Sequence, residues 1–207
     1  MHSRTTKLIF WTGLLAGIAA WTWFGWLRFD VFPRNFGEVE KGKVYRSAAL
    51  TPAAVQKVVR EHGIRTIIDL GGFDKDPIGD RNAARTAEAL GIERYVFNLE
   101  GDGTGNPNAY VAALKVMNDP ARQPVLVHCS AGAQRTSGAV MLYRDFVQGK
   151  PLEETYAEAQ QYRHDPSRNP RLMPYLKQHE REIREAWLRG CMIEHYPQVP
   201  IAPVAAP

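Results

Sequence analysis

The chain divides into one unbroken apolar segment and a longer region of alternating apolar runs. Residues 8–27 contain no Asp, Glu, Lys or Arg. As a helix they would span roughly 30 Å, the thickness of the hydrocarbon core of a bilayer. Aromatic residues typical of the headgroup region crowd the C-terminal end of this segment: Trp21, Trp23, Phe24, Trp26 and Phe29. The pattern predicts a short basic N-terminal tail over residues 1–7 and a single-pass transmembrane anchor over residues 8–29.

A cleaved signal peptide is the alternative interpretation of this N-terminal segment. Gly17, Ile18 and Ala19 offer small residues at a plausible cleavage site behind a short apolar core. Cleavage there would leave a tryptophan-rich apolar terminus on the mature chain, so we favour an uncleaved anchor. Basic residues flank both ends of the segment, and the positive-inside rule therefore does not assign the domain to the cytoplasmic or to the periplasmic or extracellular side.

Beyond a linker over residues 30–42, short β-branched and apolar runs alternate with amphipathic segments. The runs that predict strands are residues 44–46, 65–70, 95–97 and 124–128. Predicted helices cover residues 51–63, 80–91, 106–118, 133–148, 152–162 and a final stripe from 172 to 187. This alternation predicts an α/β domain over residues 43–190, with a central, mainly parallel sheet flanked by helices. The proline-rich segment 191–207 is predicted to be a disordered tail.

Composition narrows the classes of function. The chain has 207 residues, 44% of them hydrophobic and 23% charged, which suits one globular domain. A net charge of +4 is too small to indicate nucleic-acid binding, and no nucleic-acid partner is expected. Two distant cysteines, Cys129 and Cys191, exclude a disulfide-stapled module and a cysteine-rich zinc site. Cys191 is expected to be a plain free thiol.

The chemistry-bearing residues follow the most apolar predicted strand, residues 124–128. Ligands of α/β sheets bind beyond the carboxyl ends of central strands. Here the strand leads into Cys129, a tight turn with Gly132 at its centre, Arg135 and then a helix. Such a turn at a helix N-terminus points backbone N–H groups inward and forms a nest for a tetrahedral oxyanion. Arg135 can bind two phosphate oxygens at once, and the same nest stabilises a thiolate, which makes Cys129 a candidate nucleophile.

The sequence H-C-x-x-G-x-x-R-T from His128 to Thr136 resembles the phosphate-binding loop of the cysteine-dependent tyrosine and dual-specificity phosphatases. Small bacterial members also carry an early Y-R-S-A segment like residues 45–48. The resemblance covers about residues 44–161. It implies that Cys129 forms a phosphocysteine, that His128 orients the loop, and that the Thr136 hydroxyl bonds the sulfur. The implied phosphate-binding residues are Ser130, Ala131, Gly132, Ala133, Gln134 and Arg135.

The resemblance also implies a general acid, an aspartate on a mobile loop about thirty residues before the cysteine. Asp102 lies 27 residues before Cys129, among glycines, and is our candidate; Glu100 is the alternate. Asp69 is expected to hydrogen-bond backbone or to support the loop rather than touch substrate. Gln134 is a candidate for positioning the hydrolytic water. Arg46, and Arg163 with His164, could line the cleft, but a solvated face is the favoured interpretation for each.

The predicted function is therefore hydrolysis of phosphomonoesters, with no metal and no cofactor. The loop side chains of Ser130, Ala131, Ala133 and Gln134 are neutral, which fits a single phosphate on a protein better than a polyanion. Phosphotyrosine is favoured over phosphoserine and phosphothreonine. Two alternatives stay open: a membrane-tethered pseudophosphatase that only binds phosphorylated partners, and a rhodanese-type sulfurtransferase. The pseudophosphatase needs no nucleophile, and rhodanese loops resemble this one less closely.

Overall fold

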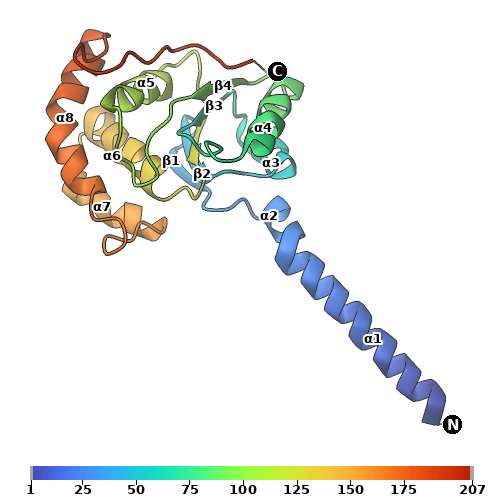
Figure 1. The fold of residues 1–207 in the computed structure, drawn as a ribbon. Helices are drawn as coiled ribbons and strands as arrows, with labels where there is room; N and C mark the ends of the chain where they lie inside the picture. The colour runs from blue at the N-terminus through green and yellow to red at the C-terminus, as the bar shows by residue number, and fades with distance from the viewer. Residues whose placement is uncertain (1, 206–207) are drawn as a thin grey trace.

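A five-stranded sheet with strand order β1-β2-β5-β3-β4 forms the centre of the domain in a computed structural model that describes residues 2–205 (Figure 1). Strands β2, β5, β3 and β4 run parallel, and β1 is antiparallel to β2. The predicted α/β fold with a mainly parallel central sheet is confirmed. The strands are β1 (Gly37–Glu40), β2 (Val44–Ala48), β3 (Thr66–Asp69), β4 (Glu93–Val96) and β5 (Val125–Cys129).

Helices begin and end mostly where the sequence places cap residues. Thr51 accepts a hydrogen bond from the N–H of Ala54 at the start of α3, and Asn106 caps α5 in the same way. Asp76 caps α4, so this helix begins three residues before the predicted start at residue 80. The helices of the domain are α3 (Pro52–His62), α4 (Pro77–Ala89), α5 (Pro107–Met117), α6 (Gln134–Gln148), α7 (Leu152–Gln161) and α8 (Leu172–Arg189).

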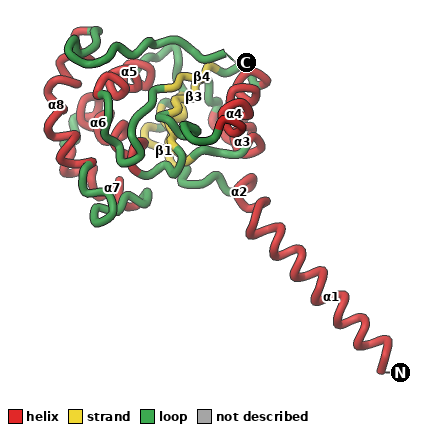
Figure 2. The backbone as a smooth tube through the Cα atoms, viewed as in Figure 1, coloured by secondary structure: helices red, strands yellow, loops and turns green. Residues whose placement is uncertain are grey.

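The helices cover the two faces of the sheet unequally. Helices α5 to α8 lie on one side, and α3 and α4 lie on the other (Figures 1 and 2). Strand β5 contributes to both cores, because Val125 and Val127 pack with the larger group of helices and Leu126 packs toward α3. This double burial explains the wholly apolar run that precedes Cys129.

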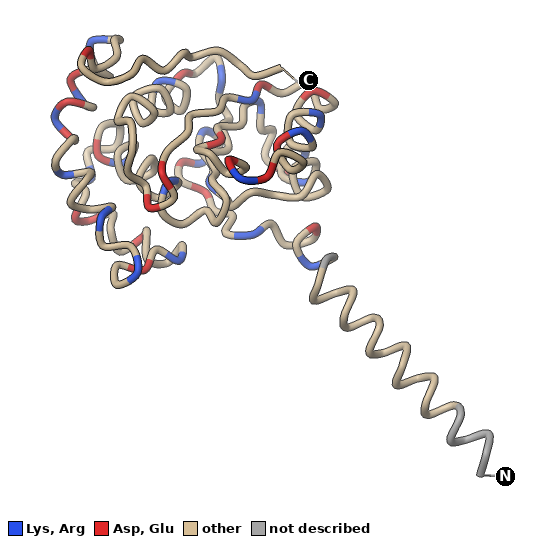
Figure 3. The backbone as a smooth tube through the Cα atoms, in the orientation of Figure 1, with Lys and Arg blue, Asp and Glu red and all other residues tan. Residues whose placement is uncertain are grey.

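The N-terminal segment forms α1 (His2–Thr22), a π-helical turn (Trp23–Leu27) and α2 (Arg28–Val31), and it projects away from the domain (Figure 1). Residues Leu8–Gly25 are long and apolar enough to cross a membrane and are not buried against the protein. A signal sequence would pass the same test. Among the residues that Figure 3 colours as described, Lys, Arg, Asp and Glu lie on the domain and at the base of this helix. At that base, Lys57 on α3 donates to the carbonyl oxygen of Val31 at 2.7 Å.

Two segments differ from the sequence prediction. The predicted linker, residues 30–42, contains β1, so the sheet begins before residue 43. The tail, predicted to be disordered from residue 191, instead lies along the domain, with Ile193 buried in the core and the N–H of Val204 bonded to the carbonyl of Arg94. Prolines supply few hydrogen-bond donors, but the side-chain amide of Asn108 binds both the N–H and the carbonyl of Ile193.

Candidate active site

The loop that joins β5 to α6 curls around the sulfur of Cys129. Cys129 is the last residue of β5 and is buried, and the N–H of Gly132 lies 3.3 Å from its Sγ. Gly132 has a φ of +70°, and a Cβ at this position would come within 2.6 Å of the carbonyl oxygen of Ser47. Only glycine fits this close approach to β2 without strain.

The carbonyl oxygens of this loop are bonded on its outer side. The N–H of Ala49 donates to Ser130, the side-chain amide of Asn35 donates to Ala131, and the guanidinium of Arg46 donates to Gly132. Because a trans peptide unit points its C=O and N–H in opposite directions, these bonds turn the N–H groups toward the sulfur side. In the part of the chain that the structure describes, the N–H of Gly132 on the sulfur is the one such contact. This arrangement of bonded carbonyls is the one that an anion-binding nest requires, and anion binding by the loop stays a prediction.

Arg135 lies in the first turn of α6 and is 6% exposed. Its Nη1 donates to the carbonyl oxygens of Leu70 and Gly71, in the loop after β3, and lies 3.8 Å from a carboxylate oxygen of Asp74. The guanidinium is thus held against the loop that follows β3. This placement keeps a permanent positive charge beside the phosphate-binding loop.

Arg46 is a supporting residue that the sequence interpretation missed. It is fully buried on β2 rather than solvated, and its Nη2 donates to Gly132 O at 3.0 Å and to Ser137 Oγ at 2.7 Å. Burial lowers the pKa of Arg46 to about 10, partly offset by the nearby Tyr162, so the group stays charged at neutral pH. The sequence signal that could have indicated a buried role for Arg46 is its position in the Y-R-S-A segment, inside a predicted strand.

Asp69 hydrogen-bonds backbone as expected, in the loop that follows its own strand. Its carboxylate accepts a hydrogen bond from the N–H of Gly72 at 2.5 Å and one from Arg94 at 2.7 Å. Arg94 also pairs with Asp80 at 2.6 Å. The two carboxylates offset the buried charge of Arg94 and fix the loop against which Arg135 rests.

The candidate acid, Asp102, lies on the loop between β4 and α5. One carboxylate oxygen accepts from the N–H and the hydroxyl of Thr104, at 3.1 and 2.7 Å, and the other lies 3.1 Å from Nη1 of Arg171. Burial raises the pKa of Asp102, but the bonds from Thr104 and the charge of Arg171 outweigh it and lower the pKa below its ordinary value. Glu100, the alternate, is exposed.

Comparison with known proteins agrees with this geometry. A family model described as "DSP-PTPase phosphatase fused to NAD+ Kinase" matches residues 30–172, more than half of the chain. The chain belongs to the cysteine-dependent dual-specificity phosphatase family. Inositol diphosphatase DSP3 of Arabidopsis thaliana is 34% identical over 109 residues, which are 50% of this phosphatase and 50% of that relative. The phosphatase thus spans about half the length of the curated relative.

Solved structures share the fold at low sequence identity. The core catalytic domain of the PP-IP phosphatase SIW14 from S. cerevisiae is 24% identical, with a TM-score of 0.54 over 63% of this phosphatase and 76% of that chain. TpbA of P. aeruginosa is 21% identical, with a TM-score of 0.60 over 75% of this phosphatase and 91% of that chain. At these identities the comparison shows the fold alone.

A second missed residue of the phosphatase is His164, which is buried and not solvated. Its Nδ1 lies 2.6 Å from Oε1 of Gln134, and its Nε2 lies 3.0 Å from the hydroxyl of Tyr156. Burial lowers the pKa of His164. A neutral ring with its proton on Nδ1 satisfies both contacts, donating to Gln134 and accepting from Tyr156. The Gln134 side chain, the candidate for positioning water, is therefore held in one orientation.

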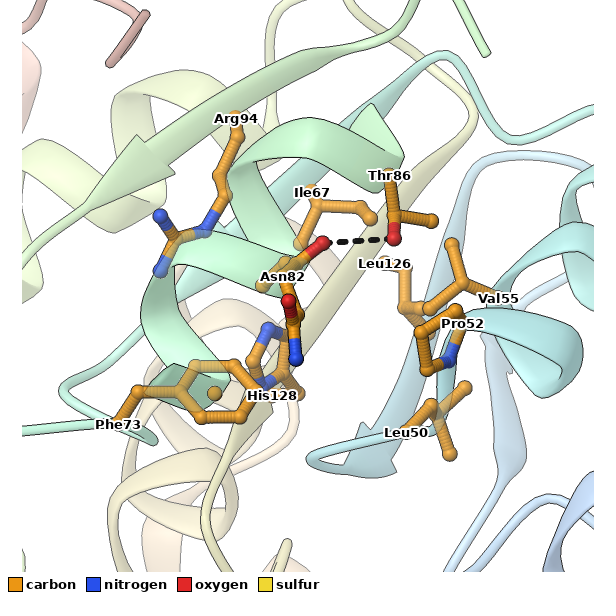
Figure 4. Close-up of a pocket in the computed structure, with 12 residues that line it drawn as sticks. Leu50, Pro52, Val55, Ile67, Phe73, Asn82, Thr86, Arg94, Leu126 and His128 are labelled. Carbon is orange, nitrogen blue, oxygen red and sulfur yellow. Dashed lines mark hydrogen bonds between the residues drawn. The ribbon is translucent and has the colours of Figure 1, made fainter. Parts of the chain in front are cut away.

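The first and last residues of the loop motif, His128 and Thr136, are both buried. Burial lowers the pKa of His128, which lies edge-on to the ring of Phe73 with 6.0 Å between centroids. His128 also forms one wall of a cavity of about 120 Å³ between α3 and α4, in Figure 4. The predicted bond from the Thr136 hydroxyl to the sulfur does not form: among the described residues that hydroxyl contacts no hydrogen-bond partner.

Proposed function

We propose that this phosphatase hydrolyses phosphate monoesters through a phosphocysteine formed on Cys129. The observation that carries the proposal is the loop itself, whose carbonyls are bonded outward and whose sulfur lies against the N–H of Gly132. The N-terminus of α6, the inward N–H groups and Arg135 would together bind the three non-bridging phosphate oxygens and stabilise the thiolate.

The reaction would run in two displacements. In the first, the Cys129 thiolate forms a bond to phosphorus while the bond to the leaving oxygen breaks, and Asp102 transfers its proton to that oxygen. In the second, a water oxygen attacks phosphorus, the P–S bond breaks, and the Asp102 carboxylate takes the proton of the water. Gln134, held by His164, would position that water. Inorganic phosphate leaves, and the thiolate and the protonated acid are restored.

Two substrate classes have specific support. The neutral loop side chains favour a single phosphate on a protein, with phosphotyrosine first. Inositol diphosphates are the second candidate, because the curated relative is an inositol diphosphatase and one structural neighbour is a PP-IP phosphatase. Ranking the kcat/KM values of a phosphotyrosine peptide and an inositol diphosphate separates the two.

We also propose that Leu8–Gly25 anchors the phosphatase in a membrane as a single span, on the support of its apolar length and its lack of burial. Sequencing the N-terminus of the mature protein tests this proposal. A terminus beginning near residue 20 would identify a cleaved signal and contradict the anchor.

The pH dependence of p-nitrophenyl phosphate hydrolysis tests the mechanism. Cys129→Ser should lower kcat by at least about a thousandfold, because the nucleophile is lost, while vanadate still binds. Asp102→Asn should lower kcat by about a hundredfold and abolish the fall in rate at high pH, because no acid remains to be deprotonated. Glu100→Gln is the matched control and should keep the wild-type profile.

Four outcomes would contradict this assignment. Undiminished turnover by Cys129→Ser would exclude the nucleophile. A high-pH limb that disappears in Glu100→Gln instead of Asp102→Asn would move the acid to Glu100. A wild-type protein that binds vanadate but hydrolyses no phosphate ester would be a pseudophosphatase, and transfer of sulfur from thiosulfate to cyanide would favour a sulfurtransferase.

A further inference from the structure

Arg171 has no task in the mechanism above, yet it contacts the candidate acid. It immediately precedes α8, and its side chain is 72% exposed, while the Asp102 side chain that it pairs with is 23% exposed. Exposed ion pairs contribute little stability, because water and salt compete for both charges. An anion arriving from solution can therefore displace Asp102 from this guanidinium at small cost.

The start of α8 also borders the phosphate-binding loop. A Cβ added at Gly103 would lie 2.6 Å from Cδ1 of Leu172 and 3.5 Å from the backbone carbon of Gln134. The acid loop is thus packed between Leu172, which follows Arg171, and Gln134, which precedes Arg135. Arg171 further lines a surface depression of about 550 Å³ with Thr104 and Tyr175. The depression therefore borders the acid loop and the start of α8, the two segments that meet beside Gln134.

The resting contacts of Asp102 oppose its proposed role. A general acid has to hold a proton when substrate is bound, but the Arg171 guanidinium favours the ionised carboxylate. The Thr104 bonds come from the same loop and move with Asp102, whereas the Arg171 contact comes from a different element. Releasing Arg171 is thus the change that shifts Asp102 toward its protonated form without dismantling the loop.

We propose that Arg171 is a specificity residue that binds a second anionic group of the substrate, and that its transfer from Asp102 to this group lets Asp102 hold the proton for the leaving oxygen. The inference rests on the proposed function, in which Asp102 is the general acid. A substrate with one isolated phosphate leaves Arg171 on Asp102 and is hydrolysed slowly. A phosphate or a carboxylate beside the scissile phosphate supplies the second group.

Other titratable groups around Asp102 do not provide this exchange. Tyr110 on α5 is fully buried and donates to the carbonyl of Gly103, and burial raises its pKa well above the ordinary value. Tyr175 on α8 donates to the carbonyl of Gly105, and burial raises its pKa as well. Both phenols are neutral at physiological pH. Glu100 on the loop itself is exposed, His164 bonds Gln134 on the side of the phosphate-binding loop, and Cys129 and Arg135 act on Tyr110 from that same side.

The first experiment measures substrate preference in the full-length protein. One pair of substrates is phenyl phosphate and catechol bisphosphate; the other is a neutral phosphotyrosine peptide and the same peptide with acidic residues beside the phosphotyrosine. Within each pair, the kcat/KM of the substrate that carries the second anionic group is divided by the kcat/KM of the substrate that lacks it. This ratio should be about tenfold lower in Arg171→Gln than in the wild type, because one charge-assisted contact is lost. Arg171→Lys should restore part of the ratio.

The matched control is Arg168→Gln. Arg168 is 85% exposed and lies in the segment before α8, and it pairs with Asp165 rather than with the acid loop. Its variant should keep the wild-type ratios. A fall in the catechol bisphosphate ratio in Arg171→Gln identifies the second group as a phosphate. A fall in the ratio for the acidic peptide identifies it as a carboxylate. Unchanged ratios for both pairs, or an equal fall in Arg168→Gln, would overturn the proposal.

The second experiment follows the pH dependence of kcat for phenyl phosphate. Arg171 lowers the pKa of Asp102, so Arg171→Gln should move the high-pH limb of the profile to higher pH. In the wild type, catechol bisphosphate should show the same displacement relative to phenyl phosphate, and Arg171→Gln should abolish that difference. A limb that stays in place in Arg171→Gln would also overturn the proposal.

These results separate failure of the inference from failure of the proposed function. Cys129→Ser and Asp102→Asn test the nucleophile and the acid without involving Arg171. If both behave as expected while the Arg171→Gln ratios stay at the wild-type values, the exchange is wrong and the phosphatase mechanism stands. If Asp102→Asn keeps its high-pH limb, the general acid has been misassigned and the inference fails with it.

Discussion

The phosphate-binding loop and the acid loop carry the two halves of the proposed chemistry, but they are held in different ways. The phosphate-binding loop is fixed from outside by buried groups: Arg46, which is fully buried, binds the carbonyl of Gly132. The acid loop has one buried contact, from the Tyr110 hydroxyl to the carbonyl of Gly103, but its carboxylate and its far end are held by exposed contacts, from Arg171 to Asp102 and from Tyr175 to Gly105. The first loop is preorganised by the core, whereas the carboxylate of the second rests on a contact that a substrate can replace.

This difference follows from what each loop does in the reaction. The phosphate-binding loop presents fixed N–H dipoles in both displacements, and preorganised dipoles stabilise charge without reorganising during the reaction. The acid loop changes its protonation state between the two displacements and has to reach the leaving group. A loop of the second kind works better when its partners are weakly bound, so the exposed ion pair suits its task.

The largest expected effect comes from replacing one glycine in each loop, Gly132 and Gly101, by alanine. Gly132→Ala places a Cβ 2.6 Å from the carbonyl oxygen of Ser47 at a φ of +70°. The strain should cost about 1–3 kcal/mol of stability, and the displaced loop should lower kcat/KM by about a hundredfold. Gly101→Ala meets nothing within 4 Å and should change both values little. Urea unfolding and steady-state kinetics check the pair; comparable losses in both variants would remove the distinction between the loops.

Arg46→Met tests the outer support of the phosphate-binding loop. The variant leaves the buried Gly132 carbonyl and Ser137 hydroxyl without their charged donor, which should lower the free energy of unfolding by about 2 kcal/mol. Phosphate affinity should fall about tenfold, because the loop carbonyl is free to turn inward. Arg60→Met, on the exposed face of α3, is the control. Equal stability of the two variants in urea would show that Arg46 does not hold the loop.

The sequence predicted the parts of this site that depend on local patterns. Cys129, Gly132 and Arg135 stand in a short motif after an apolar strand, and cap residues such as Thr51 mark helix starts. Asp69 was also placed correctly, because an aspartate inside a buried strand has to bond something nearby.

Residues that act across long sequence separations were missed or misread. Arg46 meets Gly132 from 86 residues away, and His164 meets Gln134 from 30 residues away. An isolated arginine or histidine is usually solvated, so composition favours the wrong interpretation until the chain path is known. The prediction of a disordered tail was wrong for the same reason. Ile193 of the tail is bonded to Asn108, which lies 85 residues earlier. Long-range bonds of this kind leave no periodic signal in the sequence.

The smallest expected effect sharpens the comparison within the acid loop itself. Tyr175→Phe removes one exposed hydrogen bond, to the carbonyl of Gly105, while the ring keeps its contact with His179. The free energy of unfolding should fall by about 0.5–1 kcal/mol, and kcat should change by less than about threefold. Hydrogen exchange over residues 101–105 should become faster. Tyr110→Phe is the buried counterpart, because its hydroxyl bonds the carbonyl of Gly103 inside the core. It should cost more, since a carbonyl left unpaired away from water is penalised in full. Equal costs would mean that the acid loop is held as firmly from its exposed side as from its buried side, and the contrast with the phosphate-binding loop would then fail.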